Sequence, residues 1–329
     1  MKLLVIGLGS MGKRRIRLLK KYFIQEGTEN WKICGVDNLE IRCKEVKETY
    51  GIDTFSSLEE AMESDVFDGA VISTSPLSHG KIIKQCLENK LHVFTEINLV
   101  SDFYNENINL AKKNEKVLFL SSTFMYRKEI RYIKSQLERE RTGIYNYHIG
   151  QYLPEWHPWE SYKKFFVNDE RTNGCREIFA IELPWLIDIF GKPISVYSTH
   201  NKMSTLELNY DDAYCVVIEH ETGIIGNLLV DIVTPNTERQ FKFWNEKKYI
   251  EWGGTPDSLK VLDTDIKEII SVDLYDCIEQ QQEYNSFIIE NAYFDELVNF
   301  INVITRKEKQ KYFFEQDIAI LRWIDEIEK

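Results

Sequence analysis

The segment from Leu3 to Gly12 constrains the fold of this chain more than any other part of the sequence. A short apolar run leads directly into Gly7, Gly9 and Gly12 in the pattern G-x-G-x-x-G, and a basic stretch suited to a helix follows. In such a strand–turn–helix unit the glycines allow a tight turn, the close approach of a pyrophosphate, and close packing of the helix. Unpaired N–H groups and the positive dipole end of that helix attract phosphate. The segment therefore predicts a nucleotide-binding turn.

An acidic residue follows this turn at a suitable spacing. Asp37 ends a second apolar run, 25 residues after Gly12, and an acid that binds the ribose of a dinucleotide is expected about 20 residues on. A carboxylate there accepts hydrogen bonds from the ribose hydroxyls and repels a 2′-phosphate, so the sequence favours NAD over NADP as cofactor. The alternative is that Asp37 only caps a turn at the end of a strand.

Composition narrows the remaining classes of function. The chain has a net charge of −12 and 43% hydrophobic residues. Its 329 residues are enough for two domains with their own cores. The sequence contains no basic patch of the kind that binds nucleic acid, so we do not expect nucleic acid as a partner. The basic residues between Lys13 and Lys21 are interpreted as a solvated helix face beside a phosphate site. No segment resembles a signal peptide or a membrane span. Six scattered cysteines without a C-x-x-C pair fit reduced thiols, so we expect a cytoplasmic protein without a metal site.

The first part of the chain alternates between two kinds of segment, which predicts a parallel α/β sheet with right-handed crossovers. Apolar runs predict strands at 2–6, 32–36, 69–73, 91–95 and 116–121. Helices are expected between them, at 12–25, 40–50, 57–63, 79–89 and 102–114. We place the end of this nucleotide-binding domain at residue 122.

Residues 123–329 show a different pattern and predict an α+β domain with a large, mostly antiparallel open sheet. Strands are expected at 144–152, 194–202, 212–220, 223–233, 239–245, 247–252, 258–263 and 267–274. Helices are expected at 127–141, 176–190, 285–305 and 314–328, the last of which could pack back on the first domain. Helices cover one face of such a sheet, so we expect its other face to be buried in a homodimer or homotetramer.

Several motifs together resemble the Gfo/Idh/MocA family of sugar-type oxidoreductases over essentially the whole chain. The motifs are the glycine turn with Asp37, the segments Ser73 to His79 and Cys86 to Glu96, Gly143-Ile144, and Tyr293 to Leu297. The resemblance implies a Rossmann domain that binds NAD(P), followed by a domain that binds a sugar, sugar phosphate, nucleotide sugar or inositol. The implied cofactor-binding residues are Gly7, Gly9, Ser10, Met11, Gly12, Asp37, Thr74, Pro76, His79 and Glu96.

The chain also departs from the family pattern where protons are handled. The family usually carries E-K-P where this chain has Glu96-Ile97-Asn98, so the lysine is absent. In the helix of the second domain, counting back from Gly191 puts Ile181 at the family's histidine and Pro184 at its second aspartate, in a register that could be off by one. Ordinary alcohol oxidation needs a group that takes the hydroxyl proton, so substitute residues are required.

Candidate substitutes lie in two segments of the second domain. His157, Glu177 and Glu182 are the candidate catalytic residues, because an imidazole or a pair of acids with perturbed pKa values can serve as acid and base. The candidate substrate-binding residues are Tyr152, Trp156, Trp159 and Arg176. Each has a structural alternative: an aromatic turn for residues 151–162, and pairing with an acid for Arg176.

Three functions remain open from the sequence. The favoured one is an NAD-dependent oxidoreductase of a sugar or nucleotide sugar, resembling the branch of the family associated with bacterial surface-sugar gene clusters. The second is an enzyme that uses NAD transiently for epimerisation or elimination. The third is a family member that binds NAD or a sugar without net redox turnover.

Overall fold

The computed structural model describes residues 1–28, 30–157, 160–281 and 287–329. Their contacts divide the chain into two compact units. The first unit contains residues 1–122 and 293–318, and the second contains residues 123–292 and 319–329. The first unit therefore includes a late segment that the sequence-based boundary assigned to the second domain.

The first unit is built on a six-stranded parallel sheet with the order β3-β2-β1-β4-β5-β6. Its strands are β1 (Lys2–Ile6), β2 (Lys32–Val36), β3 (Asp53–Phe55), β4 (Gly69–Ile72), β5 (His92–Thr95) and β6 (Leu118–Leu120). The strand order reverses between β1 and β4, which is where open α/β sheets bind their ligands. Strands β1, β4 and β5 are almost wholly buried and apolar, as a sheet covered on both faces requires.

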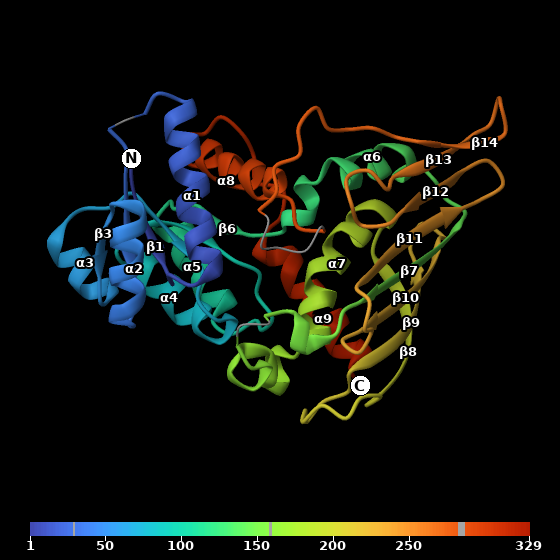
Figure 1. The fold of residues 1–329 in the computed structure, drawn as a ribbon, viewed down its shortest axis with the longest axis horizontal. Helices are drawn as coiled ribbons and strands as arrows, with labels where there is room; N and C mark the ends of the chain where they lie inside the picture. The colour runs from blue at the N-terminus through green and yellow to red at the C-terminus, as the bar shows by residue number, and fades with distance from the viewer. Residues whose placement is uncertain (29, 158–159, 282–286) are drawn as a thin grey trace. The chain divides into compact units, whose positions relative to one another are not determined.

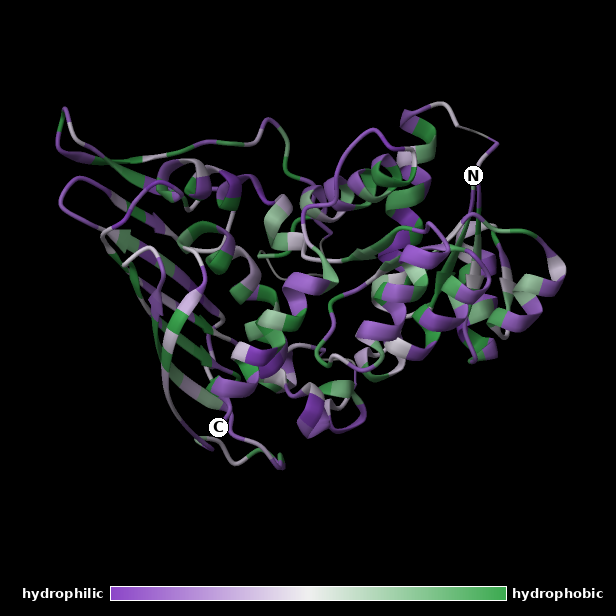
Figure 2. Ribbon diagram, turned by 180° about the vertical axis from the view of Figure 1, so that it is seen from behind, coloured by the Kyte–Doolittle hydropathy of each residue, from purple (hydrophilic) through white to green (hydrophobic). Residues whose placement is uncertain are grey.

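Amphipathic helices connect these strands, and Figure 2 shows both hydrophilic and hydrophobic stretches along them. They are α1 (Ser10–Gln25), α2 (Glu40–Tyr50), α3 (Leu58–Ser64), α4 (Pro76–Glu88) and α5 (Tyr104–Lys113), with α8 (Glu290–Ile304) added late in the chain. Phe300 of α8 packs edge-on against the stacked rings of Phe94 and Phe119, with ring centroids 5.5 and 5.6 Å away. The late segment thus supplies part of the first unit's core.

The second unit contains a mixed eight-stranded sheet with the order β14-β13-β12-β11-β7-β10-β9-β8 (Figure 1). Its strands are β7 (Ile144–Gly150), β8 (Pro193–Asn201), β9 (Ala213–His220), β10 (Ile225–Asp231), β11 (Glu238–Trp244), β12 (Tyr249–Trp252), β13 (Lys260–Asp263) and β14 (Glu268–Ser271). Among the strands that the structure describes in this sheet, only β7 and β10 pair in parallel, and the other pairings are antiparallel.

One face of this sheet packs against α7 (Gly174–Phe190), and α6 (Lys128–Leu137) packs on α7 (Figure 1). Asn173 caps α7 through its side-chain oxygen, which accepts a hydrogen bond from the Arg176 N–H at 2.7 Å. The helix α9 (Phe314–Ile327) crosses from one unit into the other. Short 3₁₀ turns complete the described chain: η1 (Thr123–Tyr126), η2 (Leu153–Glu155), η3 (Tyr162–Lys164), η4 (Phe166–Asn168) and η5 (Glu170–Thr172).

The other face of the large sheet carries exposed apolar side chains in adjacent strands. The strand registers put five of them on this one face: Ile144, Tyr197, Val217, Ile225 and Trp244. We call these five residues the outer row.

The predicted fold class is confirmed: a parallel Rossmann-like sheet is joined to a second, mostly antiparallel sheet. The expectations missed β3, which has only three residues, and placed several ends one to five residues away from those observed. Among the described residues, no helix is both long and apolar enough to cross a membrane.

Candidate functional site

The glycine turn has a separate steric reason for each of its glycines. Gly7 has φ +91°, and a Cβ there would lie 2.7 Å from the Ser73 carbonyl oxygen. A Cβ on Gly12 would lie 1.9 Å from the Gly7 carbonyl oxygen, so only glycine lets α1 begin so close to the turn. A Cβ on Gly9 would meet nothing nearer than the Arg42 guanidinium at 4.0 Å. The space over Gly9 is therefore open to a bound group.

The start of α1 is suited to an anion. Gly9 is its N-cap residue, so no side chain caps the helix, and its first turn, which includes Ser10 and Met11, carries no acidic residue. Backbone N–H groups at a helix start without a side-chain cap favour phosphate. The sequence predicts a pyrophosphate at this turn, and the open space over Gly9 and this helix start would accommodate one.

Asp37 lies at the carboxyl end of β2 and faces the same turn. Its Oδ2 accepts a hydrogen bond from the Leu8 N–H at 2.8 Å, and its Oδ1 accepts one from the Leu39 N–H at 2.9 Å. Arg42 places Nη1 3.5 Å from Asp37 Oδ2, while its side chain is 45% exposed. A carboxylate and an exposed guanidinium thus stand together where the adenosine ribose is expected.

Two loops that follow β4 and β5 are tied together by a buried histidine. The ring of His79 lies 2.6 Å from the Asn98 side-chain oxygen and 2.9 Å from the Thr74 carbonyl oxygen. Burial lowers the pKa of His79. Pro76 starts α4, and the Thr74 hydroxyl contacts Ser78 at 2.8 Å. His79 therefore acts within the protein, where it fixes the shape of the two loops beside the glycine turn.

Glu96 belongs to a buried ion-pair cluster. Arg15 of α1 is fully buried and makes two hydrogen bonds with Glu96, at 2.6 and 2.9 Å. The same guanidinium lies 2.8 Å from Glu296 of α8, which also accepts hydrogen bonds from the Ser121 hydroxyl and the Ser122 N–H. The prediction of a solvated helix face is therefore wrong for Arg14 and Arg15, whose exposed fractions are 2% and 0%. They point inward because carboxylates and aromatic rings are there to receive them.

In the second unit, Glu182 is the centre of a buried cluster. Its Oε2 accepts hydrogen bonds from the Tyr147 hydroxyl at 2.8 Å and the Trp185 indole N–H at 2.7 Å, and Oε1 pairs with Arg239. Glu182 is 0% exposed. Arg239 also lies over the ring of Phe124, at 4.5 Å. With its charge paired and its oxygens occupied, Glu182 holds α7 to strands β7 and β11.

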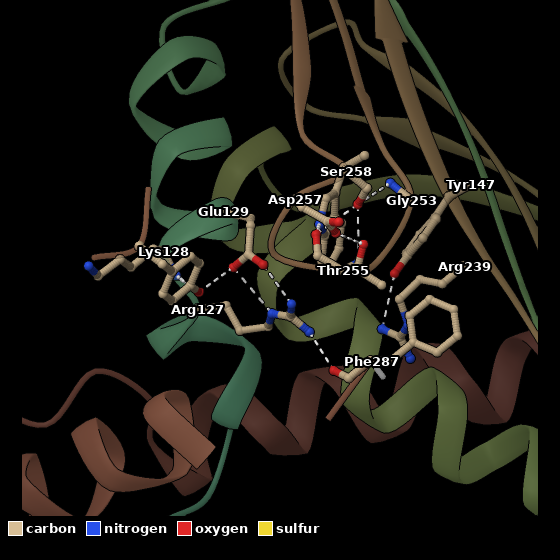
Figure 3. Close-up of polar contacts among 12 residues, drawn as sticks. Arg127, Lys128, Glu129, Tyr147, Arg239, Gly253, Thr255, Asp257, Ser258 and Phe287 are labelled. Atoms are coloured by element: carbon tan, nitrogen blue, oxygen red, sulfur yellow. Dashed lines mark hydrogen bonds and ion pairs between the residues drawn. The ribbon is translucent and has the colours of Figure 1, made fainter. Parts of the chain in front are cut away.

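A neighbouring arginine is neutralised in the same way. Figure 3 shows Arg127 between Glu129, at 2.6 Å, and the Phe287 carbonyl oxygen, at 2.8 Å. The Tyr275 hydroxyl donates to Glu129 at 2.6 Å. Figure 3 also shows Tyr147 beside Arg239. The cluster around Arg127 and Glu129 attaches the start of α6 to the segment that follows β14.

Glu177 differs from the other acids of α7. Its residue is partly exposed, but its Oε2 atom is buried without a hydrogen-bond partner among the described residues. Burial raises the pKa of Glu177 to about 8. A carboxyl group with a pKa near neutral is suited to proton transfer. Of the three candidate catalytic residues, this one has the most suitable surroundings.

The aromatic segment after β7 is held by local contacts. The Trp156 indole N–H donates to the Gln151 carbonyl oxygen at 3.1 Å. His157 lies 3.0 Å from Glu160 and packs against the ring of Phe165, with centroids 4.2 Å apart. Tyr152 precedes η2 and is half-buried. Trp159 lies outside the described residues.

Arg176 is occupied by acids of the chain's last helix. Its guanidinium lies 2.7 Å from Asp325 and also pairs with Glu328. The alternative that the sequence left open, pairing with an acid, describes its contacts.

The sequence alone did not reveal several residues that shape these sites: Arg15, Arg42, Asn98 and Arg239. Arg42 had one weak signal, since it follows Asp37 by five residues at the start of a predicted helix. The partners of the other three are far away in sequence, so no local pattern marked them.

Comparison with known proteins identifies a family model that matches part of the chain and several solved structures with a similar fold. Residues 1–122 match the Gfo/Idh/MocA model, described as an oxidoreductase family with an NAD-binding Rossmann fold. No curated protein matches the sequence significantly.

The solved structures that are similar to this chain share its fold over nearly the whole length. Myo-inositol 2-dehydrogenase from Lactobacillus plantarum has 14% identity and a TM-score of 0.78, covering 99% of this chain and 96% of that one. UDP-N-acetylglucosamine 3-dehydrogenase GnnA from Acidithiobacillus ferrooxidans has 14% identity and a TM-score of 0.74, covering 100% and 96%. The WlbA dehydrogenase from Chromobacterium violaceum, in complex with NADH and UDP-GlcNAcA, has 15% identity and a TM-score of 0.73, covering 99% and 92%.

Proposed function

Because residues 1–122 match the model of the Gfo/Idh/MocA oxidoreductase family, we propose that this chain is a member of that family and an NAD(P)-dependent oxidoreductase. Its substrate in this proposal is a CH–OH group of a sugar, sugar phosphate or nucleotide sugar. The family and the fold support the class of reaction, and the nucleotide-sugar dehydrogenases of the same fold suggest the class of substrate. A role in surface glycan biosynthesis is the finer form of this proposal.

The glycine turn is the observation that carries the proposal. Space for a ligand is open over Gly9, while Gly7 and Gly12 are fixed by close contacts. Gly7, Gly9, Gly12, Ser10 and Met11 are the residues that we expect to hold the pyrophosphate.

The choice of cofactor depends on Asp37 and Arg42. Asp37 favours the ribose of NAD, since a carboxylate repels a 2′-phosphate, whereas an arginine near this position accommodates that phosphate. Two backbone N–H groups already bind Asp37, so its position does not depend on Arg42. We therefore propose NAD as the preferred cofactor, with Arg42 permitting weaker binding of NADP.

Cofactor titrations test this assignment. Arg42→Ala is expected to lower affinity for NADPH and leave affinity for NADH nearly unchanged, while Asp37→Ala is expected to weaken NADH binding. If Arg42→Ala weakened both cofactors equally, Arg42 would have no role in discrimination.

We assign proton transfer to Glu177. When bound, the cofactor supplies the hydride acceptor. As the substrate C–H bond breaks and the carbonyl forms, the hydroxyl proton passes to the ionised Glu177 carboxylate; in reduction the protonated acid returns it. With a pKa of about 8, Glu177 is mostly protonated at neutral pH, which favours the reductive direction there. Oxidation is therefore expected to accelerate, and reduction to slow, as the pH rises through about 8.

The activity is tested by following NADH absorbance at 340 nm with a panel of sugars and nucleotide sugars. Glu177→Gln is expected to lower kcat by a factor of about 10² to 10⁴ in both directions, with cofactor affinity retained. His157→Gln provides the comparison, because His157 was the other candidate base. Full turnover in Glu177→Gln, combined with loss in His157→Gln, would move the role to His157.

One observation favours a second function, binding without net turnover. Ile97 occupies the position of the family lysine and can neither give nor take a proton. A protein that binds NADH, shows no turnover with any substrate, and exchanges no substrate hydrogen with solvent would support this alternative. Hydrogen exchange without net NADH would instead indicate transient use of NAD for epimerisation or elimination.

We also propose that the outer row of the large sheet contacts a second copy of the chain. Its five exposed apolar side chains lie on one face of neighbouring strands, and contiguous apolar surface favours association. A homodimer or homotetramer would bury them.

A further inference from the structure

The second unit contains a polar pocket that the proposed chemistry does not use. Its volume is about 410 Å³, within the range of about 300 to 1,000 Å³ typical of small-molecule sites. Its lining residues come from the start of β9, the cap of α7 and the end of α9. Neither the glycine turn nor any of the three candidate catalytic residues lines it.

A buried tyrosine presents an unused hydroxyl to this pocket. Tyr214 is 3% exposed, and its ring is fixed between His200, at 4.9 Å, and Phe179, at 5.5 Å. Tyr214 lines the pocket, and the charges of Glu328 and Asp211, which also line it, act on its hydroxyl. Among the described residues, this hydroxyl has no hydrogen-bond partner. The Tyr214 hydroxyl is not among the fully buried, unpartnered polar atoms of the described residues, so it is accessible to a bound group. A ligand in the pocket would supply a hydrogen-bond partner.

The remaining lining groups are rich in hydrogen-bond acceptors. Glu170, Asp211 and Glu328 contribute carboxylates, and Lys202 contributes one ammonium group. His200 contacts only one oxygen of Asp211, at 2.6 Å. Arg176 pairs with Glu328 and offsets its charge. The two remaining carboxylates still carry more negative charge than Lys202 carries positive charge. The site therefore accepts hydrogen bonds and disfavours anions.

This chemistry fits a ligand that has several hydroxyl groups and no negative charge. Carboxylates and the Asn209 amide can bind adjacent hydroxyls, and an amine on the ligand would gain from the net negative lining. We propose that the pocket binds a neutral or amine-bearing polyol of monosaccharide size, with the Tyr214 hydroxyl as a direct contact.

Saturation-transfer NMR on the full chain without cofactor tests the proposal. The probes are glucosamine, glucose and glucose 6-phosphate, each titrated to obtain an affinity. Glucosamine is expected to bind at least as well as glucose, and glucose 6-phosphate more weakly than both. Tyr214→Phe removes only the hydroxyl and is expected to weaken glucosamine binding by about threefold to tenfold.

Two further variants separate this pocket from other sugar-binding surfaces. Tyr197→Phe, an exposed tyrosine of β8 outside the pocket, is the matched control and should leave the affinity unchanged. Glu170→Gln lies on the exposed rim and should reduce the preference for glucosamine over glucose without disturbing the fold.

The outcomes are distinguishable from those of the redox proposal, because no turnover is measured. Absence of binding by all three probes would overturn the inference. So would an affinity unchanged by Tyr214→Phe, since the sugar would then bind elsewhere, or a preference for glucose 6-phosphate.

Discussion

Glu177→Gln should change how the stability of this protein depends on pH. The pKa of Glu177 rises from 4.5 in the unfolded chain to about 8 in the folded protein because its carboxyl group is buried. Between these values the folded state binds a proton that the unfolded state lacks, so the free energy of unfolding falls as the pH rises, by at most about 1.4 kcal/mol per pH unit from this group. At pH 7 the raised pKa of Glu177 has lowered the free energy of unfolding by about 3 kcal/mol.

The glutamine variant removes that proton uptake. Burial of its amide has its own cost, but that cost does not depend on pH, so the slope is the diagnostic quantity. We expect wild type to lose stability relative to Glu177→Gln between about pH 5 and pH 8, with the curves parallel above that range.

Urea unfolding at closely spaced pH values measures this difference, and the fluorescence of the buried Trp185 and Trp252 reports on the second unit. Glu246→Gln, on an exposed turn, is the control and should follow wild type. Identical slopes for wild type and Glu177→Gln would refute both the raised pKa and the assignment of Glu177 as the proton-transfer group.

Three further variants test other parts of the structure. Arg15→Met leaves two buried carboxylates without their cation and is expected to lower the free energy of unfolding by about 3 to 5 kcal/mol; Glu296→Gln should cost less, and equal costs in urea unfolding would contradict the cluster's geometry. Gly12→Ala should lose NADH binding together with thermal stability, because its Cβ would lie 1.9 Å from a backbone carbonyl oxygen, whereas Gly9→Ala should keep its Tm and lose only NADH affinity in titration calorimetry. Val217→Lys should convert an oligomer to monomers in sedimentation velocity with no loss of secondary structure, and an unchanged mass would exclude the outer row as the contact.

Local sequence patterns predicted most of the strands and helices of the fold. Apolar runs and glycine-containing turns predicted the strands of both sheets, because buried strands need continuous or alternating apolar residues. The strand β3 was missed since Asp53–Phe55 is short and only half-buried. Asn173 was not predicted to start α7, although its capping contact defines the first turn.

The candidate sites were less accessible to sequence reasoning. The glycine turn could be predicted because its steric requirements are local. The surroundings of Glu182 and Arg176 depend on partners from distant strands and from the last helix, and nothing in their own segments revealed that these charges are paired. Glu177 was a candidate from the sequence, but its unpartnered oxygen is a property of the packed structure.

The cluster around Arg15 has a consequence for the order of folding during synthesis. Most of the first unit is translated first, yet its core needs residues that are made near the end of the chain. Until Glu296 and Phe300 have been synthesised, Arg15 has only Glu96 as its acidic partner, and Phe94 lacks the ring that packs on its edge. We therefore expect the part of the chain that is made first to reach its final structure last.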